Sequence, residues 1–454
     1  MAAASRGSVP SRRHGEQPNT PRPCSSARIQ SLGLKRNHLL ASSSTTETTS
    51  PPTWRGEKKR ARCGRRPARS GSSDWANLGG DGPAILIAEL ALTNDVADYV
   101  RFRAVCRSWR RCTPDPRGAD QGALDGRFLP RQWLMLDKAS GGPCRRRFLN
   151  VSTGERIRTD IPEVADHKLL ALTPEGLLLL LHVPTLVVRL LNPLTRQLTS
   201  LPPVTALLTP PQQRAWRTEG VLSRDAIWVC GAGLADDAST VAVCFSRPKI
   251  TVVAKPGDEH WTVVDDRYID STLPFAGRFY CAVGSSVMVL SNNSASDQGP
   301  AAPWQLVTVV QRSKPLYFCR MSDGLHFVDN GGELMLVHRM LRESSDGTQG
   351  AKRKREYDVY RVDFDAGDLV PVKSLRGRAV FMGRRRAVSV LPAKAFPSVV
   401  ADTLYLGSDC DEKTRLNCIG GYNVADGSSE PRHHHWSFVA CFSRCIRGTG
   451  KHLA

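Results

Sequence analysis

The sequence lacks a long hydrophobic run. Its most apolar stretch, LLLLLHVPTLVV at residues 177–188, is shorter than the roughly 20 residues that a membrane helix needs, and it contains His182 and Pro184. The first residues also lack the apolar segment that is typical of a secretory signal. We therefore expect neither a membrane span nor a secretory leader.

Motifs for catalysis and phosphate binding are missing as well. The sequence has no G-x-S-x-G elbow, no Walker-type loop, no H-E-x-x-H and no G-x-G-x-x-G after a strand; the GAG at residues 231–233 lacks the further spaced glycine. Neighbouring acids such as Asp265 and Asp266, or Asp363 and Asp365, are typical of solvated turns. We expect no enzymatic activity and no cofactor.

Paired cysteine spacing is absent too. The 13 cysteines follow no regular pattern, which without a signal peptide indicates reduced thiols in an intracellular protein. The tightest grouping of possible metal ligands contains no C-x-x-C pair, and we favour an exposed loop over a zinc site. Its members are Cys410, Cys418, His433, His434, His435, Cys441 and Cys445.

Acidic residues are scarce in one part of the chain. The net charge is +20, and residues 1–73 alone hold 15 Lys or Arg against 3 acids. This segment is rich in Ser, Pro and Arg and has little apolar periodicity, so it is predicted to be a disordered basic tail. Because most of the excess charge lies in the tail, we do not expect the folded part to bind nucleic acid.

Two basic clusters in the tail, within EKKRARCGRRPAR at residues 57–69, resemble a bipartite nuclear-import signal. The candidate residues are Lys58, Lys59, Arg60, Arg62, Arg65, Arg66 and Arg69. A solvated linker and an organellar transit peptide are the alternatives, because the tail is also rich in Arg and Ser. The expected compartment is the nucleus or the cytoplasm, with organellar targeting left open.

Helical periodicity is found in residues 74–115 and is scarce in the later part of the chain. A helix over residues 98–112 would place Phe102, Val105, Cys106 and Trp109 on one apolar face, with the arginines mostly on the solvated side. A cysteine in such a stripe is expected to pack as a small hydrophobe.

The preceding helix is apolar on most sides. Asn94 and Asp95 should end it, and Asp95 can cap the next helix. Three short helices make a small core, which usually needs a partner surface.

These helices resemble an F-box, the element that docks on the adaptor of SCF-type ubiquitin ligases. The matching residues of the second half are Val100, Arg101, Phe102, Val105, Cys106, Arg107, Trp109 and Arg110. In the first half Leu78 and Asp81 match, but Gly79, Gly82 and Pro83 depart from the pattern, and Gly82 and Pro83 are expected to fray the first helix. The resemblance implies adaptor binding, with Trp109 as an anchor. The residues that would form the docking surface or its supporting core are Leu78, Asp81, Leu86, Ile87, Leu90, Val105, Cys106 and Trp109.

Short apolar runs separated by turns fill residues 131–435, after a linker at 116–130 and before a C-terminal tail at 436–454. FLNVSTGERIRTDIP (148–162) and LLNPLTRQLTSLPP (190–203) are partial repeats, and their asparagines, Asn150 and Asn192, lie 42 residues apart. One four-stranded propeller blade takes roughly 40–50 residues. We predict an all-β domain, a β-propeller of unknown blade count, with a pair of sandwiches as the alternative.

The stretches GRAVFMGRRRAVSVLPAKAFPSVVADTLYLGSDC (377–410) and IGGYNVADGSSEP (419–431) resemble a plant F-box family with a propeller-like C-terminal domain, of the KIB type. The resemblance implies a substrate receptor of a cullin-RING ubiquitin ligase. Its F-box would bind the adaptor, and through it a cullin, while the β domain would bind an unknown target protein. The alternative is a propeller binding protein with a degenerate F-box and no ligase, associated with the nucleus or with nucleic acid.

Overall fold

The computed structural model describes residues 82–118, 124–138, 144–220, 226–235, 239–292, 303–312, 324–343, 353–383, 386–392, 396–406 and 421–428. All of them belong to one compact unit, Ser70–Ala454. Several predicted features lie outside the described residues: the basic tail with its nuclear-import candidates, Leu78, Asp81, and the Cys and His grouping from Cys410 to Cys445.

Three short helices precede the strands, as predicted: α1 (Pro83–Asn94), α2 (Val96–Val105) and α3 (Arg107–Arg111). The expectation that Pro83 would fray the first helix is wrong. Pro83 is the first residue of α1, where a missing N–H costs nothing and the fixed φ suits the helix. None of the described helices combines the length and the apolar character that a membrane crossing requires.

The predicted cap between the first two helices is confirmed. Asp95 has extended backbone, and its carboxylate accepts a hydrogen bond from the Ala97 N–H at 2.8 Å. The single helix predicted over residues 98–112 is wrong. Cys106 is extended (φ −154°, ψ 171°), ends α2 and caps α3, where its Sγ accepts from the Trp109 N–H at 3.4 Å. The expected apolar stripe is therefore divided, and Val105 is 63% exposed.

The strands form six sheets in chain order, which we number as blades 1 to 6. Blade 1 contains β1 (Trp133–Lys138), β2 (Arg145–Asn150) and β3 (Arg156–Asp160); blade 2 contains β4 (His167–Leu172), β5 (Leu178–His182), β6 (Val187–Leu191) and β7 (Leu198–Pro203). Blade 3 contains β8 (Trp228–Ala235), β9 (Thr240–Arg247), β10 (Lys249–Ala254) and β11 (Thr262–Asp265).

Blade 4 contains β12 (Ser271–Phe275), β13 (Arg278–Val283), β14 (Ser286–Asn292) and β15 (Trp304–Gln311); blade 5 contains β16 (Gly324–Asp329), β17 (Leu334–Glu343), β18 (Arg353–Asp363) and β19 (Asp368–Val372). Blade 6 contains β20 (Ala379–Met382), β21 (Ala387–Val390), β22 (Thr403–Leu406) and β23 (Gly421–Asn423), with β20 and β22 parallel. Short helical turns η2 (Gly126–Phe128), η3 (Pro162–Ala165) and η4 (Val204–Leu207) and helix α4 (Pro210–Glu219) lie in connections.

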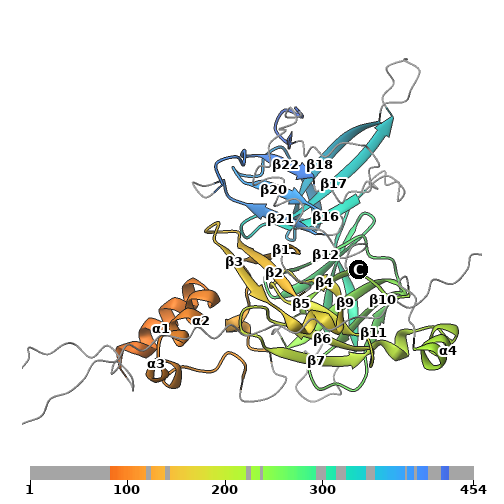
Figure 1. Cartoon of the computed structure of the whole chain (residues 1–454). Helices are drawn as coiled ribbons and strands as arrows, with labels where there is room; N and C mark the ends of the chain where they lie inside the picture. The colour runs from red at the N-terminus through yellow and green to blue at the C-terminus, as the bar shows by residue number, and fades with distance from the viewer. Residues whose placement is uncertain are drawn as a thin grey trace, which may run out of the picture. The chain divides into compact units, whose positions relative to one another are not determined.

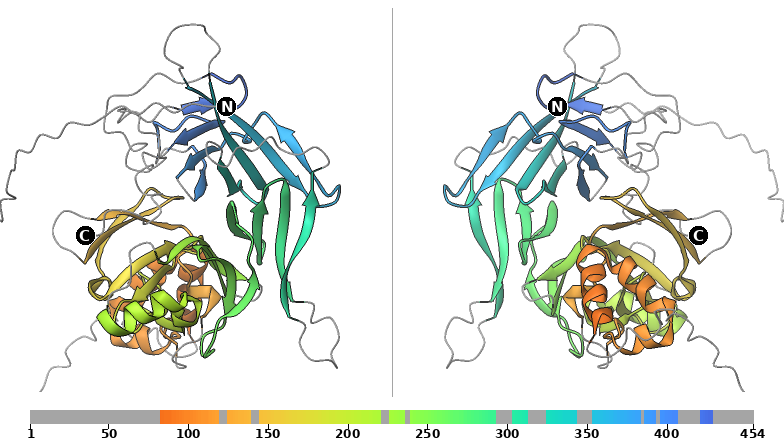
Figure 2. Two further views of the ribbon diagram at one scale, coloured as in Figure 1. Left: turned by 90° about the vertical axis from the view of Figure 1, so that its right-hand side faces the viewer. Right: turned by 90° about the vertical axis from the view of Figure 1, so that its left-hand side faces the viewer.

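The six sheets form a closed ring, a six-bladed β-propeller, so the sandwich alternative is wrong. Strands β4, β8, β12, β16 and β21 are successive neighbours, and Figures 1 and 2 show the sheets following one another in chain order. Separate apolar clusters join each blade to the next. The ring closes where Leu134 and Leu149 of blade 1 pack with Phe381 and Val390 of blade 6.

Among the described strands, blades 1 and 6 contact each other through side chains and not through backbone pairing. The first and last sheets are each built from their own stretch of chain, and no described strand pairs with strands of both. On the blade 6 side of this interface, Phe381 is fully buried and stacks on Tyr405 of the neighbouring strand, with ring centroids 4.9 Å apart.

The predicted 42-residue repeat corresponds to one blade. Asn150 and Asn192 occupy the same turn of blades 1 and 2, between β2 and β3 and between β6 and β7. Each side-chain Oδ1 accepts from the N–H groups two and three residues ahead, at 2.8 and 3.0 Å for Asn150 and at 3.1 and 3.2 Å for Asn192. Asn423 repeats the turn after β23, where its Oδ1 accepts from the Ala425 N–H at 2.8 Å. An asparagine that closes its own turn explains the repeat.

The GAG stretch is glycine because two neighbouring strands approach closely. A Cβ on Gly231 of β8 would lie 1.8 Å from Oγ1 of Thr272 on β12. A Cβ on Gly233 would lie 2.2 Å from Cγ of Pro274. The motif therefore belongs to propeller packing.

We expect Gly231→Ala to lower the free energy of unfolding by about 1–3 kcal/mol, the usual cost of an overpacked core. Gly324→Ala is the matched control, because the nearest atom to its added Cβ is 3.4 Å away in β16. Urea unfolding measures both variants. Equal stability of the two variants would contradict the close approach of β8 and β12.

A buried carboxyl lies near the same strands. Glu175, in the turn after β4, is 4% exposed, and its Oε1 accepts from the Leu234 N–H at 3.0 Å. Burial raises the pKa of Glu175, and this hydrogen bond opposes only part of the shift. Burial also lowers the pKa of Arg386, next to β21, to about 10, and the charge of Glu175 opposes that change.

The raised pKa of Glu175 predicts a pH-dependent stability. The native carboxyl keeps its proton above the ordinary pKa of 4.5, so the free energy of unfolding should fall as the pH rises from 4.5 to the native pKa. Urea unfolding across this range should find Glu175→Gln gaining stability relative to the wild type with rising pH, then levelling off. Glu219→Gln, at the exposed end of α4, is the control. A constant difference for Glu175→Gln would refute the shift.

Candidate protein-docking surface on the helices

Helix α1 has a small-residue face and a large apolar face. Ala84 and Ala88, one turn apart, are 0% and 1% exposed and pack with Tyr99 and Phe102 of α2. Leu86 and Leu90, also one turn apart, are 73% and 72% exposed. The alanines let α1 approach α2 closely, which leaves the leucines pointing away from the helical core.

We call Leu86, Ile87 and Leu90 the docking face. Ile87 is 43% exposed, and all three were predicted to bind a partner. Single exposed apolar residues are ordinary, but three on one short helix face are typical of an interaction site. Val105, also in the predicted set, is exposed at the end of α2.

Trp109 and Cys106 support the helices from within. The Trp109 ring is half-buried and stacks on Phe102, with centroids 4.4 Å and planes 19° apart. Cys106 is half-buried as the cap of α3. The structure thus places both residues beside the helical core, where Trp109 and Cys106 support the predicted docking surface.

Arg103 is a structural residue that the sequence analysis missed. The arginines of α2 and α3 were predicted to be mostly solvated, but Arg103 is 8% exposed. Its guanidinium donates to the carbonyl oxygens of Thr113 at 2.5 Å and Pro114 at 2.8 Å. The Tyr99 hydroxyl donates to the same Pro114 oxygen at 2.8 Å. These bonds fix the chain where it leaves α3, and no local pattern distinguishes Arg103 from its neighbours.

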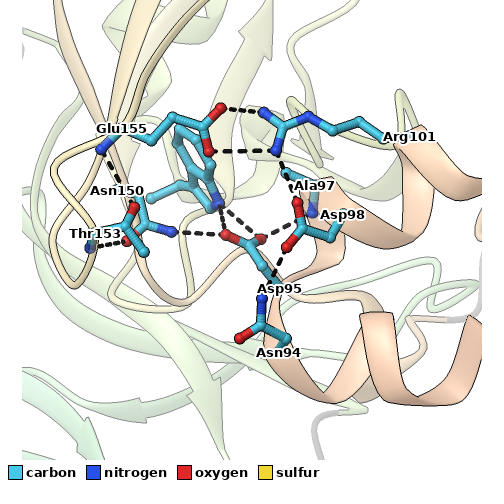
Figure 3. Close-up of polar contacts among 9 residues, drawn as sticks. Asn94, Asp95, Ala97, Asp98, Arg101, Asn150, Thr153 and Glu155 are labelled. Atoms are coloured by element: carbon cyan, nitrogen blue, oxygen red, sulfur yellow. Dashed lines mark hydrogen bonds and ion pairs between the residues drawn. The ribbon is translucent and has the colours of Figure 1, made fainter. Parts of the chain in front are cut away.

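One carboxylate joins the helices to blade 1 (Figure 3). Besides capping α2, Asp95 accepts from the indole Nε1 of Trp133 at 2.9 Å and from Nδ2 of Asn150 at 2.6 Å. Trp133 and Asn150 are each 1% exposed and Asp95 is half-buried, so the donors of these bonds are shielded from water. Hydrogen bonds to a charged acceptor contribute about 1.5–3 kcal/mol each, and Asp95 is therefore the main tie.

An ion pair lies beside this tie (Figure 3). The Arg101 guanidinium binds the Glu155 carboxylate in the β2–β3 turn and also Asp98, at 2.8 Å. The hydrogen bond to Glu155 is the main cause that raises the pKa of Arg101. Because the side chains of Arg101 and Glu155 are 49% and 41% exposed, solvent screens the pair and its contribution to stability is small.

The matching turn of blade 2 makes a second attachment. Nδ2 of Asn192 donates to the carbonyl oxygen of Phe128, at the end of η2, at 2.8 Å. Nε of Arg117 donates to the Thr195 carbonyl oxygen at 3.2 Å in the same turn. The segment from α1 to η2 is thus held by equivalent asparagine turns of two successive blades.

No metal or cofactor site accompanies these contacts within the described ranges, where no three His, Cys, Asp or Glu side chains gather as metal ligands. What the helices offer is an apolar face fixed to a propeller, which suits protein binding.

Comparison with known families supports the propeller. The family model described as the KIB1-4 beta-propeller matches residues 148–424, which spans the region from β2 to β23 and more than half of the chain. The comparison with curated proteins gave no significant match.

Solved structures resemble the chain only distantly. Hydrazine synthase of Kuenenia stuttgartiensis is 12% identical with a TM-score of 0.28, over 62% of this chain and 71% of that chain. The periplasmic gluconolactonase of Pseudomonas aeruginosa is 12% identical with a TM-score of 0.25, over 64% of this chain and 76% of that chain. Likeness at this level carries no information about function.

We expect Asp95→Ala to lower the free energy of unfolding by about 3 kcal/mol, since it removes a cap and two hydrogen bonds to a charged group. Asp95→Ser keeps an N-cap oxygen but is too short to reach Trp133, so it should lose about 2 kcal/mol. Trp133→Phe removes the indole donor and also part of a buried ring, so its cost should be smaller in the Asp95→Ser background than in the wild type by the energy of the lost hydrogen bond. If Asp95→Ser were as stable in urea as the wild type, the role of Asp95 would be limited to capping α2.

Proposed function

Because this chain belongs to the KIB1-4 beta-propeller family, we propose that it is the substrate receptor of an SCF-type cullin-RING ubiquitin ligase. Its helices would dock on the adaptor, and through it on a cullin, while the propeller would bind a protein target. The chain would do no chemistry of its own. The observation that carries the proposal is the docking face: Leu86, Ile87 and Leu90 are exposed on α1, the helix that precedes the F-box-like sequence of α2 and α3.

The energetics of the docking face favour a protein partner. Fully burying one leucine or isoleucine side chain contributes about 1.5–3 kcal/mol, so three together supply enough for a stable contact. A short helix that presents residues at i, i+1 and i+4 suits insertion into an apolar groove. Because α3 and Arg103 hold the other side of α1 and α2 in place, little ordering is needed on binding.

The two asparagine turns add an argument from geometry. A ligase receptor has to hold its target at a set distance from the adaptor. Here Asp95 with Asn150, and Phe128 with Asn192, tie the helices to blades 1 and 2. A target on the propeller would therefore keep one orientation relative to the docking face.

The test is direct binding of the full chain to the purified SCF adaptor. Leu86→Lys combined with Leu90→Lys should weaken binding by at least about 100-fold, because two charges would enter an apolar contact. Val263→Lys is the matched control, since Val263 on β11 is 56% exposed and far from α1 in the sequence. Binding is measured by titration calorimetry, and unfolding is followed in parallel.

Trp109→Ala separates docking from support. Loss of its stacking on Phe102 should weaken adaptor binding and also lower the melting temperature, whereas the two leucine changes should leave that temperature unchanged. If the wild-type chain fails to bind the adaptor, the ligase role is refuted, and a propeller binding protein with a degenerate F-box becomes the better description.

A further inference from the structure

The two faces of blade 1 differ in what covers them. On one face Trp133 and Phe148 pack against blade 2. On the other face Leu134 and Leu149 pack against blade 6, but only over part of the sheet. The rest of that second face, on β2 and β3, consists of four arginines and Asp160.

We call Arg145, Arg147, Arg156 and Arg158 the arginine face. Side chains alternate along a strand, so Arg145 and Arg147 point to the same side as Leu149. The strand register places Arg158 directly opposite Arg147, and Arg156 directly opposite Leu149. Arg145, Arg156 and Arg158 are exposed, and Arg147 is half-buried.

This arrangement costs stability. Like charges directly opposite on paired strands repel, and Arg147 with Arg158 is such a pair. The described acid on the same side of β3 is Asp160, 3.7 Å from Arg145. Nε of Arg147 is buried without a hydrogen-bond acceptor. A cost of this kind is expected where the charges serve a binding partner.

We propose that the arginine face binds an extended acidic segment of a protein partner, with Asp or Glu at alternate positions. Alternate residues of a strand are about 6.8 Å apart, so carboxylates of an extended peptide match the spacing of Arg145 with Arg147 and of Arg156 with Arg158. Guanidinium groups bind carboxylates in a bidentate manner. In the proposed ligase this segment would belong to the target, but its binding does not depend on that role.

A peptide fits the arginine face better than nucleic acid does. Single-stranded nucleic acid is held largely by aromatic side chains on which bases stack, and the arginine face contains none. Strand β3 is also the last strand in the order of blade 1, with β2 on one side. Such an edge can add backbone hydrogen bonds to an extended peptide.

The experiment measures fluorescence anisotropy of a labelled peptide of alternating Glu and Ser with the full chain. Arg147→Glu with Arg158→Glu should weaken binding by at least about 10-fold, through loss of two charge pairs and new repulsion. Arg214→Glu with Arg217→Glu, on the exposed side of α4, makes the same charge change elsewhere and should change the affinity by less than about 2-fold. Both variants keep the basic tail, so any attraction between the tail and the acidic peptide contributes equally to the two measured affinities.

A single change adds a second readout. Arg158→Glu places an opposite charge across from Arg147, which should raise the melting temperature by on the order of 1 °C while it weakens peptide binding. Such opposite effects are expected of charges retained for binding. The adaptor titration is done on the same variant and should be unchanged, which separates a failure here from a failure of the ligase role.

Three results would overturn the proposal. If the wild type and the Arg147→Glu, Arg158→Glu variant bound the peptide with equal affinity, the arginine face would not be the binding site. Tighter binding of a single-stranded oligonucleotide, lost in the same variant, would make it a nucleic-acid surface. Aggregation of the variant with unchanged peptide binding would mean that the arginines only protect the edge of β3.

Discussion

The Asp95 carboxylate sets the relation between the two parts of the described chain. It separates α1 from α2, caps α2, and accepts hydrogen bonds from Trp133 and Asn150 of blade 1. A carboxylate has about four acceptor positions, and a site shielded from water is favourable only when donors occupy them. The donors come from residues 38 and 55 positions away in sequence, so the helices and blade 1 fold against a common group.

The propeller satisfies a different constraint, because every blade has to bury both of its faces. Apolar clusters do this around the ring, and the innermost strands approach so closely that Gly231 admits no side chain. Glu175 is a polar residue in this interior, and its Oε1 accepts a hydrogen bond from the Leu234 N–H. The outer half of blade 1 departs from this pattern, since arginine stands where neighbouring positions are leucine.

The sequence predicted features that depend on local order. The repeat of Asn150 and Asn192, 42 residues apart, indicated one blade, because each asparagine closes a turn with its own side chain. The exposed leucines of α1 were predicted from a family resemblance. The cap at Asp95 followed from its position between two helices.

Features that depend on contacts between distant residues could not be predicted. Nothing near Asp95 indicates Trp133, and Arg103 looks like any other arginine of its helix. The break at Cys106 replaces an i, i+4 pattern that fits a continuous helix equally well. The arginine face exists only through the register of β2 and β3. The number of blades could not be predicted either, because the strands of blade 6 pair in an order that differs from their order in the chain.

The asparagine turns divide their work between two atoms. Oδ1 of Asn150 or Asn192 closes its own turn, while Nδ2 points outward and holds the helical segment. The oxygen that closes the turn and the nitrogen that binds the helical segment are thus different atoms of the same amide group. In a repeating architecture, such a residue offers the same free donor at the same turn of each blade. An outer segment can bind there if it places an acceptor oxygen within hydrogen-bond distance of Nδ2. Segments can therefore be gained or exchanged around the ring during evolution without redesign of the blades that carry them.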